Sequence, residues 1–453
     1  MTLIPEVCPR SYRVYTRKNI DKNQKFKLIS KELRNAVKTV STVLPFKVNN
    51  YITEELIDWE NLPADPLFQL YFPQADMLDP AARNRIQRLL DAGAPDHTLL
   101  SAVRDIQMGF NPHPAGQMEM NVPLVDGSPV AGMQHKYDET VLFFPSHGQT
   151  CHAYCTYCFR WAQFVGLDRL RFASRNVDDL VRYLASHTEV TDVLFTGGDP
   201  LTMSAALLRR YLEPLIARKP GGLQTIRIGT KVPASWPYRF VTDRDADDLI
   251  RLFDEVVDSG LHLAVMVHYS HPRELETAAA QAAVRRIVGT GATVRCQAPL
   301  IRHVNDDPEI WARMWRAQVR LGMVPYYMFV ERDTGPKHYF KTPLARAYTI
   351  FTEAYRRVSG LCRTVRGPSM SATPGKIVIE GVSEINSEKV FVLKFLQGRD
   401  SRWVNRLFYA AWDANAHWLD ELKPAGGRKR FFFEELLEQI KSERAPDSYL
   451  KMA

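Results

Sequence analysis

Three of the six cysteines in this 453-residue chain lie within a span of eight positions. Cys151, Cys155 and Cys158 follow the spacing C-x3-C-x2-C, shortly after the β-rich run Val141–Pro145. Thiolates are the ligands that iron–sulfur clusters prefer, and three of them can hold three irons of a [4Fe–4S] cube. The fourth iron would remain open to a substrate or cofactor. The motif therefore predicts reaction chemistry rather than simple electron transfer.

A zinc site is the main alternative for this motif, followed by chance clustering. Zinc sites of this type usually combine two C-x2-C knuckles, and the sequence has no second one. His152 is the nearest candidate for a fourth zinc ligand, but it directly follows Cys151, which gives poor geometry. We expect the other three cysteines, which are scattered, to be buried apolar thiols. They are Cys8, Cys296 and Cys362.

A glycine-rich segment follows the next β-rich run and ends in Gly197-Gly198-Asp199-Pro200. Glycines let the backbone approach a ligand closely, because they carry no side chain. Asp199 can accept hydrogen bonds from an ammonium group. By itself the segment is a common turn, but its place one strand after the cysteines makes a ligand-binding role more credible.

From about residue 140 onward, β-rich runs alternate with amphipathic helical stretches. Six such units in a row predict a parallel sheet with outer helices, closed fully or partly into a barrel. In these folds the chemistry lies on loops that leave the carboxyl ends of the strands, which is where both motifs fall. The predicted strands are Val141–Pro145, Asp192–Thr196, Gln224–Ile228, His262–His268, Thr293–Ala298 and Pro325–Val330. The predicted helices are Val177–Ser186, Ala205–Ala217, Asp245–Val257, Glu274–Val288, Pro308–Leu321 and Leu344–Val358.

The chain divides by its patterns into three predicted regions. Residues 1–130 carry helical patterns, residues 131–340 form the repeating core, and residues 341–453 form a C-terminal region. Two helices are expected in the first region, and Asp79 is a plausible N-cap for the second. Two strands and a terminal helix are expected in the last. These further elements are Glu32–Leu44, Pro80–Ala92, Lys376–Ile379, Val390–Phe395 and Glu434–Glu443.

The composition, with 45% apolar and 24% charged residues, is ordinary for a globular protein. No run reaches the length of about 18 apolar residues that a membrane helix needs. Met1–Arg17 lacks the layout of a signal peptide, so we expect a cytoplasmic protein without disulfides. The net charge of +8 is scattered, which favours a solvated surface. A metal-stabilised RNA-binding protein is the non-enzymatic alternative, but nucleic acid is not expected because no RNA-binding motif is present.

The C-x3-C-x2-C spacing, with aromatic Tyr157 just before the third cysteine, resembles the signature of the radical S-adenosylmethionine (radical SAM) superfamily. The resemblance implies an α/β fold, a partial (β/α)6 barrel with a helical N-terminal extension and a C-terminal extension. It also implies that the open iron chelates S-adenosylmethionine and that an electron from the cluster cleaves it to a 5′-deoxyadenosyl radical. Tyr157 is then expected near the adenine, and Gly197, Gly198 and Asp199 near the amino group.

Over roughly residues 65–400 the chain also resembles lysine 2,3-aminomutase. That resemblance implies a second cofactor, pyridoxal 5′-phosphate (PLP), held as an imine on Lys376, and migration of an amino group from the α- to the β-carbon. It further implies a small amino-acid substrate, an electron donor such as flavodoxin or ferredoxin, and a homo-oligomer. The segments that carry it are His135-Lys136-Tyr137, Ile226–Thr230, His268–Pro272, Gln297, Val304-Asn305-Asp306, Pro325-Tyr326-Tyr327 and Pro374-Gly375-Lys376.

The same resemblance assigns roles to individual residues. Arg160 matches the arginine that grips the substrate carboxylate, and a guanidinium fork suits a planar carboxylate. Its alternative role is to balance the charge of an anionic cluster. Lys136 and Tyr137 match the PLP phosphate clamp, while His268 and Gln297 are implied cofactor contacts.

The chain departs from the lysine-specific pattern where those enzymes hold the distant ammonium of lysine with two aspartates. At the first position a carboxylate could survive as Glu331 or Asp333, and we take Glu331 as a substrate-binding residue. The second position, before Pro374, has no carboxylate. The sequence therefore does not support lysine as the substrate. Arg332 would instead suit an acidic side chain, as in glutamate-using relatives.

The phosphate clamp departs from the pattern as well. Lys136 replaces one of the family's two arginines, and Thr140 replaces the other. PLP binding should then be weaker, unless Arg227 or Lys231 compensates. The alternative is a PLP-independent radical SAM enzyme on the same scaffold, with a different hydrogen-abstraction reaction.

Overall fold

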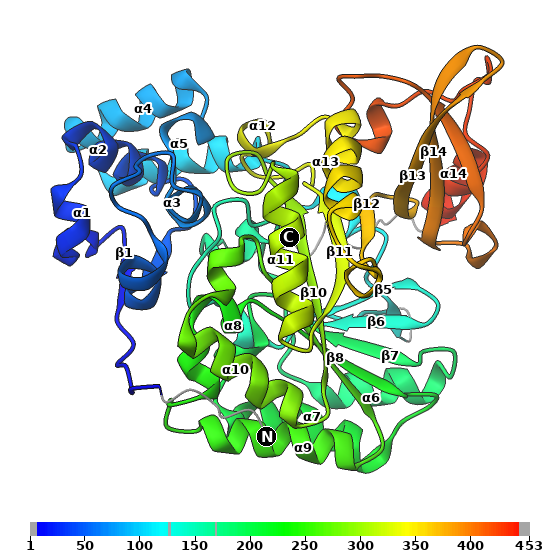
Figure 1. The fold of residues 1–453 in the computed structure, drawn as a ribbon, viewed down its shortest axis with the longest axis horizontal. Helices are drawn as coiled ribbons and strands as arrows, with labels where there is room; N and C mark the ends of the chain where they lie inside the picture. The colour runs from blue at the N-terminus through cyan, green and yellow to red at the C-terminus, as the bar shows by residue number, and fades with distance from the viewer. Residues whose placement is uncertain (1–6, 126–127, 168–169, 444–453) are drawn as a thin grey trace.

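One sheet of eleven strands runs through the computed structural model, which describes residues 7–125, 128–167 and 170–443 (Figure 1). Its strands lie in chain order, so each pairs with its neighbours in sequence. The pairs from β6 to β12 are parallel, whereas β5 and β13–β15 add antiparallel strands at the two ends. The strands are β5 (Met133–Tyr137), β6 (Thr140–Phe143), β7 (Asp192–Phe195), β8 (Thr225–Thr230), β9 (His262–His268), β10 (Thr293–Leu300), β11 (Val324–Val330), β12 (Arg366–Ser371), β13 (Gly375–Ile385), β14 (Glu388–Gly398) and β15 (Leu407–Ala411).

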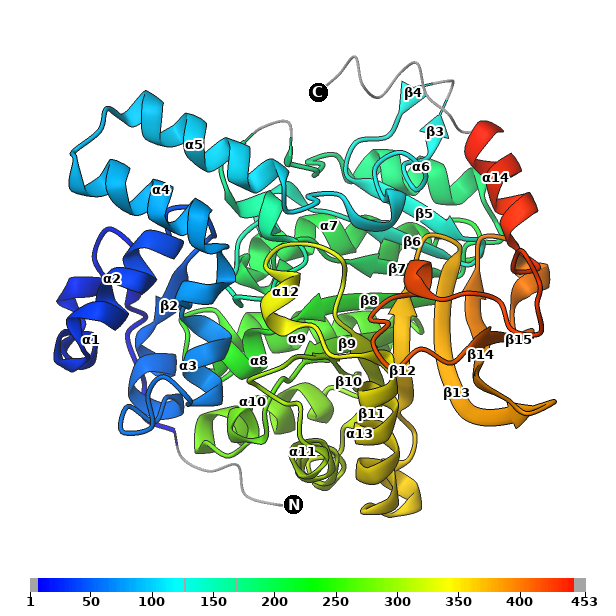
Figure 2. The same ribbon diagram turned by 90° about the horizontal axis from the view of Figure 1, so that it is seen from above.

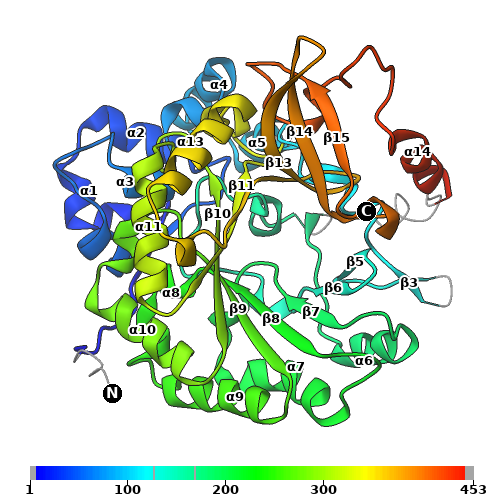
Figure 3. The same ribbon diagram turned by 45° about the vertical axis from the view of Figure 1, so that its right-hand side comes forward.

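A helix follows each of the strands β6 to β11, and these helices cover the outer face of the sheet (Figure 3). All six predicted strands and six predicted helices are confirmed, with ends that shift by a few residues. One predicted helix, Glu274–Val288, begins later: a short 3-10 helix, Pro272–Leu275, precedes it, and Thr277 caps the true start. The helices are α6 (Val177–Ser186), α7 (Ala205–Arg218), α9 (Ala246–Asp258), α10 (Ala278–Gly289), α11 (Pro308–Arg320) and α13 (Leu344–Arg356).

The parallel strands lie between these helices and the interior, which explains their apolar sequences. In β9 every residue from Leu263 to Val267 is buried. Parallel strands that are covered on both faces typically read as continuous apolar runs rather than as alternating ones. The helices bury one side only, as α9 shows with Leu249, Leu252, Phe253 and Val256.

The N-terminal region forms a helical layer on one side of the sheet, opposite the C-terminal strands (Figure 1). Both predicted helices are present, and the Asp79 side chain caps the second by accepting hydrogen bonds from the amides of Ala81 and Ala82. No helix in the described ranges is both long enough and apolar enough to cross a membrane. The elements are β1 (Val14–Thr16), α1 (Gln24–Leu28), α2 (Lys31–Val40), β2 (Lys47–Asn49), α3 (Pro66–Tyr71), α4 (Pro80–Asp91) and α5 (Asp96–Met108).

The C-terminal region continues the same sheet, because β12 pairs in parallel with β11 and in antiparallel fashion with β13. The long β13–β14 hairpin then stands out from the core, with β15 and α14 (Glu434–Glu443) beside it (Figure 2). A second apolar core lies there, with Phe395, Trp403, Phe408 and Phe433 among its members. The core and the C-terminal region are therefore linked by one continuous sheet, whereas the described strands of the N-terminal region pair only with one another.

Candidate active site

A cavity of about 310 Å³ lies at the carboxyl ends of the parallel strands. Residues of strands β6 to β12 line it, together with residues of β5 and the start of β13. Every residue that the sequence assigned to a ligand, cofactor or substrate lines this one cavity. These residues are Lys136, Tyr137, Cys151, Cys155, Tyr157, Cys158, Arg160, Gly197, Gly198, Asp199, His268, Gln297, Glu331 and Lys376.

The three predicted ligand cysteines are free thiols on the cavity wall. Burial raises the pKa of Cys155 to about 12 and that of Cys158 to about 11, and it raises the pKa of Cys151 as well. Within the described ranges, no group of three or more His, Cys, Asp or Glu side chains is arranged to hold a single metal ion. Each thiol has a neighbouring cation that favours the thiolate, so the donor set fits an anionic iron–sulfur cluster. The cations are Lys47 for Cys151, Lys231 for Cys155 and Arg160 for Cys158.

The cysteine loop is held from outside by the N-terminal region. The amide of Tyr154 donates to the carbonyl of Lys47 at 2.8 Å, and the amide of Thr156 donates to the carbonyl of Leu70 at 2.9 Å. The carbonyl of His152 accepts from the Asn49 side chain at 3.3 Å. The loop therefore depends on residues that precede it by about a hundred positions, which no spacing rule in the sequence could reveal.

The glycine-rich segment lies directly against the cysteine loop. A Cβ atom at Gly198 would lie 2.4 Å from the amide nitrogen of Thr150 and 2.6 Å from the carbonyl oxygen of Gly148. Gly197 adopts a φ of 129°, which side chains rarely tolerate. The two glycines are therefore needed for the close approach of two loops, in addition to the approach to a ligand that the sequence predicted.

Asp199 ties this segment to the end of β8. Its carboxylate accepts hydrogen bonds from the Thr230 hydroxyl at 2.8 and 2.9 Å and from the amides of Lys231 at 2.6 Å and Leu201 at 3.1 Å. Burial raises the pKa of Asp199 to about 6, against the effect of these hydrogen bonds. Because the chain already occupies both carboxylate oxygens, the main effect of Asp199 visible here is to fix the loops at the cavity edge.

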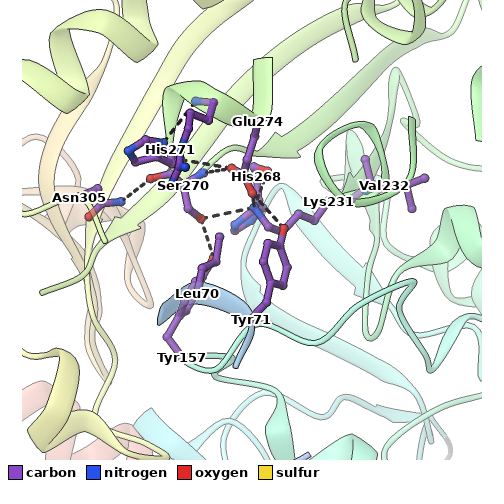
Figure 4. A network of polar contacts seen from close by, with 12 residues as sticks. Leu70, Tyr71, Tyr157, Lys231, Val232, His268, Ser270, His271, Glu274 and Asn305 are labelled. Carbon is purple, nitrogen blue, oxygen red and sulfur yellow. Dashed lines mark hydrogen bonds and ion pairs between the residues drawn. The ribbon is translucent and has the colours of Figure 1, made fainter. Parts of the chain in front are cut away.

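A buried polar network connects the ends of β8 and β9 to α3 (Figure 4). The Glu274 carboxylate accepts from Lys231 Nζ at 2.7 Å, from the Tyr71 hydroxyl at 3.0 Å and from the Ser270 amide at 2.6 Å. The Ser270 hydroxyl in turn lies 3.2 Å from the hydroxyl of Tyr157. This network fixes Tyr157, which resembles the adenine-contacting residue.

His268, at the end of β9, meets Gln297 of the neighbouring strand β10. Gln297 Nε2 lies 2.9 Å from His268 Nε2. Burial lowers the pKa of His268 to about 3, so the imidazole is neutral near pH 7. A neutral ring can accept the hydrogen bond from the Gln297 amide and keep its other nitrogen as a donor.

Lys376 enters the cavity from the start of β13. Its Nζ lies 4.4 Å from the centre of the Tyr327 ring and 5.8 Å from that of Phe329. Burial lowers its pKa to about 7, with a further contribution from nearby arginines. Among the described residues its amine has no hydrogen-bond or salt-bridge partner, so it is free to react as an uncharged nucleophile.

Two arginines lie on the aromatic ring of Phe159. The guanidinium carbon of Arg160 is 4.9 Å from the ring centre, and that of Arg332 is 4.6 Å from it. Neither forms a salt bridge with a carboxylate in the part of the chain that the structure describes. Burial, followed by the repulsion of Arg332, lowers the pKa of Arg160 to about 9. Guanidinium groups held in this way are prepared to bind anions.

The two carboxylates near Arg332 differ in their surroundings. Glu331 lines the cavity and is 8% exposed, and burial raises its pKa well above the usual value. Asp333 forms an ion pair with Lys337 instead. The structure thus brings Glu331, rather than Asp333, to the site.

The two residues expected to compensate for the altered phosphate clamp are both engaged. Arg227 binds Asp192, with Nε 2.8 Å from Oδ1, and Lys231 binds Glu274. The hydroxyl of Thr140, at the position of the missing arginine, donates to Asp192 at 3.3 Å. Lys136 remains near this end of the cavity, where its Nζ donates to the carbonyl of Ala372 at 2.5 Å.

Sequence reasoning missed several cavity residues. Tyr327 and Phe329 were given no role, yet both line the cavity two positions apart on β11, so the two-residue period of a strand could have identified them. The expectation for the scattered cysteines was wrong in one case. Cys296 and Cys362 are buried, but Cys8 is exposed, because it lies in the N-terminal segment before the first strand.

Comparisons with known proteins find sequence relatives that bear the name of lysine 2,3-aminomutase. No protein-family model matches it. A protein of Aquifex aeolicus (strain VF5) with the provisional name L-lysine 2,3-aminomutase is 29% identical over 393 residues, which is 87% of this chain and 91% of that protein. The L-lysine 2,3-aminomutase of Acetoanaerobium sticklandii is 28% identical over 52% of this chain and 53% of that enzyme.

Two solved structures show a weaker likeness. Streptococcus suis SuiB bound to S-adenosylmethionine has 11% identity and a TM-score of 0.37, over 63% of this chain and 60% of that one. A radical SAM methyltransferase from Sphaerobacter thermophilus has 16% identity and the same TM-score, over 62% of this chain and 91% of that one. Scores of this size carry no argument. By sequence, the chain is similar to proteins named L-lysine 2,3-aminomutase, over most of its length in one case and over about half of it in the other.

Proposed function

We propose that the protein is a PLP-dependent amino-acid 2,3-aminomutase, which converts an α-amino acid into a β-amino acid. The likeness to lysine 2,3-aminomutases, together with the C-x3-C-x2-C motif, supports S-adenosylmethionine and a [4Fe–4S] cluster as cofactors. The observation that carries the further step is the position of Lys376, whose amine faces the same cavity as the three cysteines and has a pKa of about 7. A reactive amine in this place is what a PLP-dependent reaction requires.

The residues of the cavity have different proposed roles. Bound S-adenosylmethionine and its cluster supply a 5′-deoxyadenosyl radical, and bound PLP supplies a conjugated ring that stabilises an unpaired electron. In this proposal Lys376 holds PLP, Lys136 and Tyr137 contact its phosphate, and Arg160 with Glu331 binds the substrate. The cysteines hold the cluster, and the contacts to S-adenosylmethionine come from Tyr157, Gly197, Gly198, Asp199, His268 and Gln297.

The architecture proposed with this function is a partial (β/α)6 barrel with a helical N-terminal extension and a C-terminal extension. The parallel strands in chain order, each followed by a helix, support it. We further propose a cytoplasmic, homo-oligomeric enzyme that takes its electron from a flavodoxin or ferredoxin.

A PLP-independent radical SAM enzyme is the second candidate. The observation in its favour is the state of the phosphate clamp: Thr140 donates to Asp192, and Arg227 and Lys231 are bound to carboxylates. A phosphate would then meet fewer free cations than the family pattern supplies.

The deciding experiment is anaerobic reconstitution with iron, sulfide and PLP, followed by borohydride reduction and peptide mapping. We expect an iron–sulfur absorption band and a reduced PLP adduct on the peptide that contains Lys376. The Lys376→Ala variant should lose the adduct and keep the iron, while Lys25→Ala, an exposed control, should keep both.

Each departure from this result has a defined meaning. Iron without a PLP adduct at saturating PLP would favour the second candidate and remove the assigned role of Lys376. Zinc in place of iron would contradict both candidates. If the adduct forms, incubation with S-adenosylmethionine, a reductant and individual amino acids should yield a β-amino acid that mass spectrometry detects.

A further inference from the structure

Lys47 lies behind the cysteine loop, at the start of β2 in the N-terminal region. Its Nζ donates to the Thr150 hydroxyl at 3.2 Å and lies 5.6 Å from the centre of the Tyr154 ring. Its carbonyl accepts the hydrogen bond from the Tyr154 amide at 2.8 Å. The side chain and the backbone of this one residue therefore both hold the loop that begins at Cys151.

The charge of Lys47 has no carboxylate partner among the described residues. A partly buried cation without an anion is unfavourable, so the anion that balances it should be sought nearby. The side chain that Lys47 Nζ binds, Thr150, directly precedes Cys151, a proposed ligand of the cluster. An anionic cluster held by Cys151 would therefore supply the missing negative charge.

The cations beside the other two cysteines have different partners. Lys231, beside Cys155, forms its salt bridge with Glu274 at 2.7 Å. Arg160, beside Cys158, lines the cavity, where a substrate carboxylate would neutralise it. Lys47 lies outside the set of residues that line the cavity. Its side chain therefore contacts the cysteine loop from outside the cavity in which substrate and S-adenosylmethionine are proposed to bind.

We propose that Lys47 raises the reduction potential of the cluster, so that the N-terminal region forms part of the redox site. Reduction adds one electron, from an external low-potential donor, to a cluster that its three thiolates already make anionic. A fixed positive charge close to Cys151 stabilises the reduced form more than the oxidised form. Lys47 is thus a positioning and charge-tuning residue rather than a catalytic one. The inference rests on the proposed cluster, but not on PLP.

The test is a redox titration of the reconstituted full-length protein, followed by electron paramagnetic resonance of the reduced cluster. Lys47→Met removes the charge and keeps most of the volume, whereas Lys47→Arg keeps the charge. Lys25→Met removes an exposed lysine of the same region and serves as the matched control. We expect Lys47→Met to lower the ratio of reduced to oxidised cluster about tenfold at a given potential, a shift of about 59 mV for one electron. Lys47→Arg and Lys25→Met should titrate like the wild type.

Two further measurements separate charge from structure. The affinity for S-adenosylmethionine should be unchanged in Lys47→Met, because the side chain does not face the cavity. An unshifted midpoint in Lys47→Met with wild-type iron content would overturn the proposal, as would an equal loss of iron in Lys47→Met and Lys47→Arg. Iron loss in Lys47→Met that Lys47→Arg restores would support it. Failure of the wild type to bind iron would count against the proposed function instead.

Discussion

At the scale of single residues, the site consists largely of groups whose charge is altered by burial. The pKa of Lys376 is lowered to about 7, that of His268 is lowered to about 3, and that of Glu331 is raised. Shifted pKa values are common in active sites, because burial and nearby like charges adjust the protonation state of the reacting groups there. Of these residues, Lys376 is the one whose pKa shift has a direct chemical consequence, because it makes the uncharged amine available near pH 7.

The pH dependence of PLP capture should report the pKa of Lys376. The ammonium form cannot attack an aldehyde, so capture should be poor below pH 7 and should rise through about pH 7 as the amine loses its proton. A free lysine would show the same rise near pH 10.4. The measurement is the yield of borohydride-trapped adduct on the Lys376 peptide between pH 5.5 and 9, with a lysine peptide as reference. A midpoint near that of the reference would contradict the proposed environment.

Arg332 should determine which amino acids bind. The cavity holds Arg160 and Arg332 without carboxylate partners in the described ranges, whereas burial favours the neutral form of Glu331. An acidic side chain should therefore bind better than that of lysine. Arg332→Gln should weaken binding of an acidic amino acid by about 1.5–3 kcal/mol, the worth of a hydrogen bond to a charged group. Binding is measured spectroscopically, and a neutral amino acid of equal length is the control. Tighter binding of lysine than of the acidic amino acid would contradict this expectation.

At the scale of elements, the sequence predicted most of the core because each parallel strand is continuously apolar and each helix has one apolar side. The strand His262–His268 and the helix Val177–Ser186 have the predicted ends. β12 was not predicted, because its residues, Arg366–Ser371, include Gly367 and Pro368, which usually mark a turn. The strand nevertheless forms, since its partner β11 supplies the pairing that its own sequence does not favour.

Gly198 tests the contact between the two ligand-binding loops. A methyl group at this position would lie 2.4 Å from a backbone nitrogen and 2.6 Å from a backbone oxygen, which cannot move independently. Gly198→Ala should destabilise the protein by about 1–3 kcal/mol and reduce its iron content. Gly289→Ala, where the added atom meets nothing within 4 Å, is the matched control. Denaturant unfolding and iron analysis provide the two readings, and wild-type behaviour of Gly198→Ala would show that the loops can separate at little cost.

At the scale of the whole molecule, no pattern in the sequence indicated that the N-terminal region belongs to the site. The contacts of Lys47, Asn49 and Leu70 with the cysteine loop join residues about a hundred positions apart. The motifs predicted the cavity residues because each motif follows the end of a strand, and the ends of parallel strands lie at the same edge of the sheet. Contacts between the N-terminal helical layer and the sheet cannot be predicted in this way, because they depend on how the two layers pack.

The Lys231–Glu274 salt bridge tests how strongly these layers are joined, because Glu274 also binds Tyr71 of α3. Both side chains are largely buried, with exposed fractions of 13% and 0%. Lys231→Met and Glu274→Gln should each lower the free energy of unfolding by about 3–5 kcal/mol, because each leaves a buried group without its partner. The double variant should cost less than the sum of the two, as measured by urea unfolding. Strict additivity would show that the pair is not coupled.

The chain order of the strands also has a consequence for biosynthesis. Each strand of the sheet meets a partner that has already left the ribosome, so the wall with the cysteine loop can form long before Lys376 exists. At synthesis rates of about 5–20 residues per second, the 218 residues between Cys158 and Lys376 take roughly 10–45 s. The proposed ligands of the cluster are thus in place before the lysine that is proposed to hold PLP, so the two cofactors can be loaded in that order.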